Sequence, residues 1–191
     1  MVMVGGGFFQ IKNKKGENKM GFDLYGVNPK QNTNKPEILT SKFSWELEES
    51  EHKSYWKAQD KYEDENRGVY FRRNVWGWRP LWDFVHSICD DILTQKDYEF
   101  GHYNDGHKIS KTKAIRIAKR IARADKEGVI QSLEQEYNIK RDEAKSYNAQ
   151  WKETIKQKPQ LRDWTAHYPF ERESLLDFMK FCEESGGFTI C

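Results

Sequence analysis

Alternating apolar and polar residues occur near both ends of the chain and once near its middle. Residues 22–26 alternate before the turn signal Asn28-Pro29, and residues 188–190 alternate at the end. Residues 69–72 combine β-branched and aromatic side chains. These patterns are typical of short strands. Together they predict a small sheet that brings both ends of the chain to its centre.

Stretches with helical spacing lie between these strands. Residues 45–62 follow Ser44, a favourable N-cap, and have an acidic outer face. Pro80 suits the first position of a helix whose apolar face continues to Ile92. A last helix runs through Cys182 to the stop signal at 186–187. We expect the helix after Pro80 to be central to the core.

Two further periodic stretches are long and highly charged. Ser110 can cap the first, in which alanine and isoleucine form a narrow stripe between cationic flanks. The second runs from Ile130 to Ile155. They predict a helical hairpin over 110–158 that projects from, or packs on, a single domain over 20–191. The expected fold class is α+β, with a small sheet of short strands packed by helices and a long helical hairpin insertion.

Aromatic residues make up 14% of the 191 residues, so the core must depend on large rings. The net charge of +2 overstates the basic character of the chain. Four of the 32 Lys and Arg residues, but only one of the 30 acidic residues, lie in 1–19. The near-neutral remainder argues against general nucleic-acid binding and still permits a local basic site.

The three cysteines, Cys89, Cys182 and Cys191, show no paired metal-ligand spacing. Such a sparse, odd set fits a reducing cytosol better than a disulfide framework. No stretch has the length and apolar character of a signal peptide or membrane span. The sequence therefore predicts a cytoplasmic protein with no membrane partner, no metal and no cofactor.

Residues 1–19 have clustered glycines and lysines without a periodic pattern, which predicts a disordered leader. A further hypothesis is that Met20 is the native start. Codons for Lys14 to Glu17 can read AAAAAAGGAGAA, a purine-rich ribosome-binding sequence ahead of Met20. The leader would then be translated upstream sequence.

The run GVYFRRNVWGWRPLW, residues 68–82, concentrates aromatic rings and arginines. One interpretation is a core whose arginines extend to solvent. The other is a pocket in which indole rings stack on a planar ligand, guanidinium groups hold its phosphate, and an amide reads a base edge. Gly77 and Pro80 predict turns within the run, which would leave some rings beside a cavity. The residues of this predicted ligand site are Tyr70, Arg72, Arg73, Asn74, Trp76, Trp78, Arg79 and Trp82.

The turn-rich stretch 101–110 is a second candidate. It adds polar contacts to the predicted ligand site through Asn104, Asp105, His107 and Lys108. The amino terminus of the following helix favours anions. The alternatives are an ordinary tight turn, a metal site formed by His102, Asp105 and His107, and an acid/base pair of His102 and His107, as in a phosphodiesterase.

Residues 164–169 are a further aromatic segment, for which two interpretations stay open. In one interpretation the segment is a packed corner held by Pro169, with a structural role only. In the other it closes the aromatic pocket. The basic stretch 108–126 is either a solvated helix face or a surface for an acidic partner. On the second interpretation the protein would inhibit a host enzyme, with Arg116, Lys119, Arg120 and Arg123 in contact.

Five motifs, MGFDLYGVNP, YFRRNVWGWRPLW, YNDGHKIS, AHYPF and SGGFTIC, resemble a family of small uncharacterised proteins encoded by bacteriophages and prophages. The resemblance covers most of 20–191 and is weakest in the hairpin. Arg73 departs from the family's usual Phe-Arg-Asn-Asn and changes the charge of the predicted pocket.

A phage setting implies action against host defence in the cytoplasm of the host cell. We therefore expect a homo-oligomeric binding protein that sequesters a phosphate-bearing nucleotide signal, resembling ADP-ribose or a cyclic nucleotide, without cleaving it. The alternatives are the protein inhibitor of a host defence enzyme and the phosphodiesterase.

Overall fold

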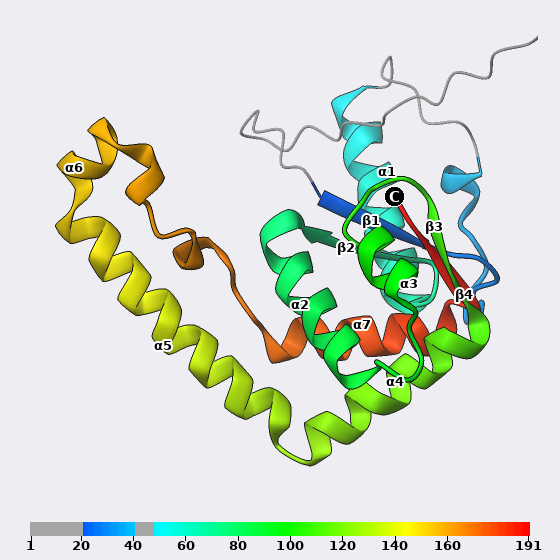
Figure 1. Cartoon of the computed structure of the whole chain (residues 1–191). Helices are drawn as coiled ribbons and strands as arrows, with labels where there is room; N and C mark the ends of the chain where they lie inside the picture. Colours follow the sequence, from blue (N-terminus) through cyan, green and yellow to red (C-terminus); the bar gives the residue numbers. More distant parts are fainter. Residues whose placement is uncertain (1–20, 41–47) are drawn as a thin grey trace, which may run out of the picture.

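The computed structural model describes residues 21–40 and 48–191 (Figure 1). The predicted leader over 1–19, the alternative start at Met20 and the expected N-cap Ser44 lie outside these residues.

Four antiparallel strands form one sheet in the order β2-β1-β4-β3. They are β1 (Gly21–Gly26), β2 (Tyr70–Asn74), β3 (His107–Ser110) and β4 (Gly187–Ile190). The central pair is the first and the last strand, and Asp23 and Cys191 exchange two backbone hydrogen bonds of 2.8 Å beside it. The expected α+β fold and the central position of these two strands are confirmed. The prediction of a turn was wrong for residues 107–109, which belong to β3, whereas Ser110 caps the following helix as expected.

Strand pairing gives the sheet two unlike faces. On the inner face Leu24 lies opposite Phe71 on one side and Ile190 on the other, and all three are buried. Three helices, α2 (Val75–Ile88), α4 (Lys111–Lys126) and α7 (Arg172–Glu184), cover this face (Figure 1). The opposite, outer face is mainly polar and consists of Asp23, Tyr25, Tyr70, Arg72, Lys108 and Thr189.

Helix α2 begins earlier than expected. Asn74 caps it by accepting a 2.9 Å hydrogen bond from the amide of Gly77. Pro80 therefore lies inside the helix rather than at its first position, and the chain turns at Asn74 rather than at Gly77 or Pro80. The early start matters because it places Trp78 and Trp82 one helical turn apart, on the buried face with Leu81 and Val85.

Trp78 and Trp82 are fully buried, and their rings stack with centroids 5.3 Å apart. Each indole N–H has a backbone acceptor. Trp78 Nε1 donates to the Gly101 carbonyl at 2.7 Å, and Trp82 Nε1 donates to the Tyr98 carbonyl at 3.2 Å. Both acceptors lie at or just beyond α3 (Gln95–Phe100), so these tryptophans attach α3 to the core.

Helix α1 (Glu49–Glu65) confirms the expected acidic helix, and its N-cap is Glu48. Its carboxyl end is held by Asn66, which is fully buried. The Asn66 side chain accepts from the amides of Asn32 and Thr33 and donates to the Tyr62 carbonyl at 2.8 Å. These bonds connect α1 to the segment that contains η1 (Glu37–Leu39).

The expected hairpin takes a different form. Helix α4 packs beside α7 under the sheet, whereas α5 (Val129–Gln150) leaves the body after Gly128, which has φ of +76° (Figure 1). The chain then returns along α5 through α6 (Lys152–Gln157), η2 (Pro159–Leu161) and η3 (Trp164–His167). We call residues 129–169 the arm. At 1.5 Å per residue, α5 makes it about 33 Å long.

The base of the arm is fixed by polar and aromatic contacts. Arg172 donates from Nε and Nη2 to the two carboxylate oxygens of Asp125 at 2.6 and 2.8 Å, and its backbone amide donates to Glu134 at 2.8 Å. Phe170 packs against Phe84 and Tyr137 with centroid distances of 5.4 and 5.1 Å.

None of the helices among the described residues has the length and apolar character needed to cross a membrane.

Candidate functional site: a basic groove on the arm

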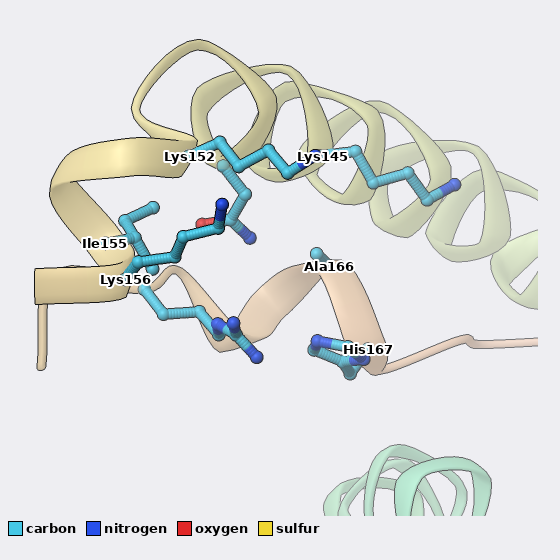
Figure 2. Close-up of a pocket in the computed structure, with 8 residues that line it drawn as sticks. Lys145, Lys152, Ile155, Lys156, Ala166 and His167 are labelled. Carbon is cyan, nitrogen blue, oxygen red and sulfur yellow. The ribbon is translucent and has the colours of Figure 1, made fainter. Parts of the chain in front are cut away.

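A groove of about 500 Å³ lies between the far end of α5, α6 and the returning segment (Figure 2). Its lining includes three lysines, one arginine and one histidine. Lys145 comes from α5, Lys152 and Lys156 from α6, and His167 from η3. Its lining, which we call the basic groove, is Lys145, Asn148, Lys152, Ile155, Lys156, Arg162, Ala166 and His167.

No acidic residue is among those that line the basic groove. Lys145 pairs with Asp142 at 2.9 Å and Lys156 with Glu153 at 2.8 Å, each within its own helix. Among the described residues, Lys152 and Arg162 have no carboxylate within ion-pair distance. The groove therefore has a surplus of positive charge, which favours an anionic ligand.

One side chain fixes the shape of the basic groove. Asn148 donates from Nδ2 to the carbonyl of Asp163 at 2.8 Å and accepts from the amide of Asp163 at 2.9 Å. Asp163 in turn starts η3 by accepting from the amide of Thr165 at 2.9 Å. This bidentate contact holds the returning segment at one register along α5, so the cations on the two sides stay opposite each other.

An aromatic cluster adjoins the basic groove. Trp76, from the start of α2, contacts Trp164, His167 and Tyr168 with centroid distances of 5.9, 5.4 and 4.9 Å. The guanidinium of Arg162 lies 5.3 Å from the ring centroid of Trp164, whose side chain is 48% exposed. Because His167 and Arg162 belong to both groups, a ligand in the groove has an accessible indole ring beside it.

The residues predicted from the aromatic run separate into several locations. Trp78 and Trp82 are in the core, where they have no surface for a ligand, so their predicted stacking role is wrong. Tyr70 and Arg72 lie on the outer face of the sheet, and Arg73 pairs opposite Phe22 on the inner side. Asn74 caps α2, and Arg79 is exposed on that helix. Trp76 alone of the run's tryptophans contacts the aromatic cluster of the arm.

Tyr70 and Arg72 are held on the outer face by Asp23. The Tyr70 hydroxyl donates a short hydrogen bond to the Asp23 carboxylate, and Arg72 Nη1 lies 3.4 Å from it. Burial, followed by this hydrogen bond and the charge of Asp23, raises the pKa of the Tyr70 phenol. Of the second predicted group, Lys108 shares this face, and the Asn104 side chain donates to the Gly21 carbonyl at 2.7 Å at one end of β1. Asp105 is exposed in the same loop.

His107 points to the other side of the sheet, away from Lys108. Its Nε2 lies 3.0 Å from the carboxylate of Asp97, a buried residue that also accepts from Lys113 and Thr94. Burial by itself raises the pKa of Asp97, but the hydrogen bonds from Lys113, Thr94 and His107 outweigh it and hold the pKa well below its usual range. His107 is thus part of a structural ion cluster beneath α3.

The other predicted surfaces are largely occupied by internal contacts. Arg116 and Arg120 both donate to Asp91, at 3.1 and 2.8 Å, and Arg123 pairs with Glu127 at 2.7 Å. His102 contacts Asp83 at 3.2 Å, a different carboxylate from the one beside His107. Among the described residues, no three His, Cys, Asp or Glu side chains gather in a way that could hold a metal ion.

In comparisons with known proteins, the chain matches no protein-family model, no curated protein and no solved structure. The resemblance to phage-encoded proteins stays a prediction. The sequence analysis does not predict the lysines and the arginine of the basic groove. It does single out the aromatic segment 164–169, which contains Trp164 and His167, as one that could close a pocket. The one local signal of the lysines is the spacing of Lys145, Lys152 and Lys156, which recur on one side of a helical stretch.

Proposed function

We propose that the protein binds a phosphate-bearing nucleotide in the basic groove and holds it without chemical change. The observation that carries the proposal is the groove's lining, in which four Lys and Arg side chains and a histidine face one space with no acid among them. Phosphate oxygens are the natural partners of such a set, and Arg162 offers the planar fork that pairs with them.

The aromatic cluster supports a nucleotide over a simple anion. Trp164 is half exposed next to Arg162, so a base can stack on the indole while its phosphates reach the lysines. The proposal keeps the predicted ligand class and moves its site. The stacking ring is now Trp164, backed by Trp76, rather than Trp78 or Trp82.

Binding without turnover accounts for the side chains that surround the groove. Lysines and an arginine neutralise phosphate, whereas general acid/base chemistry needs a group that titrates near neutral pH at the reacting atom. His167 is the one histidine in the lining, and its ring packs against those of Trp76 and Trp164 with centroid distances of 5.4 and 5.5 Å. In the phage setting that the sequence resemblance implies, retention of an intact nucleotide would sequester a signal.

The test is calorimetric titration of the protein with ADP-ribose, adenosine and pyrophosphate. We expect ADP-ribose to bind best, adenosine to bind weakly because it lacks phosphate, and pyrophosphate to show intermediate affinity. Lys152→Gln and Arg162→Gln should each weaken ADP-ribose binding by about fivefold to tenfold, with less dependence on salt. Lys140→Gln, on the same helix as Lys145 and paired with Glu136, is the matched control.

The bound compound should be recovered intact by mass spectrometry after long incubation. Equal affinity of the Lys152, Arg162 and Lys140 variants would refute the site, and a hydrolysed product would refute binding without turnover. If adenosine and ADP-ribose bound equally, phosphate recognition would be wrong.

A further inference from the structure

The edge of β2 borders a second groove, whose lining differs in charge from that of the basic groove. Among the described strands, β2 lies at one edge of the sheet and pairs with β1 alone. The amide of Gly26 donates to the Val69 carbonyl at 3.0 Å, which shows which residues of β2 direct their backbone groups toward β1. Because these residues alternate in an antiparallel pair, the backbone groups of Phe71 and Arg73 bond to β1. Those of Tyr70 and Arg72 point outward from the edge of the sheet.

The outward edge of β2 faces an open groove of about 460 Å³. Among the described residues, no hydrogen bond reaches the outward amide and carbonyl groups of Tyr70 and Arg72. An exposed edge of this kind is a template for another strand. Its lining, which we call the edge groove, is Asp60, Glu63, Asp64, Arg67, Tyr70, Phe71, Arg72, Arg73 and Asp177.

The charge of the edge groove indicates what kind of strand it accepts. Two of its three arginines have carboxylate partners, since Arg67 lies 3.4 Å from Asp64 and Arg72 lies 3.4 Å from Asp23. Arg73 has no carboxylate partner among the described residues, and its guanidinium lies 5.5 Å from the Phe71 ring centroid. Three acids of the lining, Asp60, Glu63 and Asp177, likewise have no cationic partner among these residues. They outnumber Arg73, so the net unpaired charge in the groove is negative.

Carboxylates are also crowded on the helix side of the edge groove. Burial, together with the charges of Asp60 and Asp64, raises the pKa of Glu63 despite an opposing hydrogen bond from Gln59. A cationic side chain entering the groove would relieve this repulsion. Asp177, from α7, lies in the same lining and adds a carboxylate from a second element.

We propose that the edge groove binds an extended peptide segment of a partner protein, one that carries lysine or arginine at alternate positions. The segment adds a strand to β2 through the backbone groups of Tyr70 and Arg72. Its basic side chains on one face meet Asp60 and Glu63 of α1. This site is independent of nucleotide binding on the arm.

The test uses a blocked peptide that alternates valine and lysine, titrated against the full chain by fluorescence anisotropy. Two comparison peptides replace the lysines with glutamate or the central residue with proline. We expect only the lysine peptide to bind, with slower amide exchange at Tyr70 and Arg72 on binding. Equal binding of the glutamate or proline peptide, or protection confined to another surface, would overturn the proposal.

Two variants at one position separate backbone pairing from side-chain contact. Arg72→Pro removes the outward amide without breaking a bond to β1, because proline is tolerated where the strand amide points to solvent. Arg72→Ala keeps that amide and loses the same side chain. We expect Arg72→Pro to weaken peptide binding by about fivefold or more relative to Arg72→Ala. Equal affinities would rule out strand addition, provided that circular dichroism shows both variants folded.

A charge variant tests the partner class separately. Asp60→Asn combined with Glu63→Gln should weaken binding of the lysine peptide by about tenfold. Glu136→Gln combined with Glu153→Gln, two exposed acids on the arm, is the matched control and should leave it unchanged. An equal loss in both pairs would mean that the peptide responds to net charge and not to the edge groove.

Discussion

The indole rings of Trp76 and Trp164 lie within 5° of parallel, with their centroids 5.9 Å apart. One ring belongs to the body and the other to the arm, so this stack is a direct contact between the sheet-packing helices and the returning segment. Trp164 is the more exposed of the two, and in the proposed complex its ring is the one on which the base stacks.

Replacing Trp164 with Ala should reduce ADP-ribose affinity by about 5- to 150-fold, because base stacking on an aromatic ring contributes about 1–3 kcal/mol. Titration calorimetry measures this directly. Trp151→Ala removes another exposed tryptophan of the arm, one outside the groove lining, and should leave affinity unchanged. A loss in both variants would indicate a general effect on the arm.

Asp97→Asn should lower the free energy of unfolding at neutral pH by about 2 to 4 kcal/mol, because it breaks a buried carboxylate's contacts with Lys113 and His107. Asp97 has a lower pKa folded than unfolded. The folded state therefore binds fewer protons, and the contribution of Asp97 is present above the unfolded pKa of about 3.9 and is lost as the pH falls below it.

Urea unfolding of wild type and Asp97→Asn at neutral and acidic pH checks this dependence. The difference between the two proteins should shrink on acidification. Asp142→Asn, an exposed residue of α5, should show little difference at either pH. If the difference in unfolding free energy between the two proteins stayed constant with pH, the contribution of Asp97 would come from packing and not from its charge.

Gly101→Ala should destabilise the fold by about 3 kcal/mol or more, since a Cβ there would collide with the indole Nε1 of Trp82 in a packed core. Gly77 is the contrasting position. It lies in the first turn of α2 and the nearest atom to an added Cβ is 3.5 Å away. Gly77→Ala should therefore be neutral or stabilising by about 0.5 to 1 kcal/mol. Thermal unfolding of both variants measures the two effects.

The three thiols should react at very different rates with a thiol-specific reagent in the folded protein. Burial raises the pKa of Cys89 to about 12 and that of Cys182 well above its usual value. Cys191 is exposed, although partial burial also raises its pKa. We expect mass spectrometry to find modification at Cys191 first and at the other two only after unfolding. Early labelling of Cys182 would indicate that α7 opens locally.

Most of the fold was predictable from periodicity, and the exceptions have physical reasons. The central strands and α7 carry clear apolar patterns. Strand β3 has one buried residue, Ile109, in its four positions, so its pairing with β4 leaves no local signature. The start of α2 was misplaced because proline favours a first helical turn, whereas the cap at Asn74 determined the actual start.

The site was less predictable because it depends on contacts between distant segments. With the start of α2 misplaced, the tryptophans of the run appeared to surround a pocket. The actual helix puts Trp78 and Trp82 on its buried face and leaves only Trp76 near the arm. The cations of the basic groove look like ordinary solvated lysines in the sequence. Their convergence results from the chain reversal at Pro159 and the tether between Asn148 and Asp163.

Strand β4 comes after every other described element, yet it is the only partner of β3 and lies beside β1 at the centre of the sheet. During synthesis, β1 and β2 can pair early, but β3 has to wait for the residues of β4 to leave the ribosome. The sheet therefore cannot close until α4, α5, α6 and α7 have been synthesised. A chain that ends prematurely before β4 would keep its helices' apolar faces exposed and be a ready substrate for proteases.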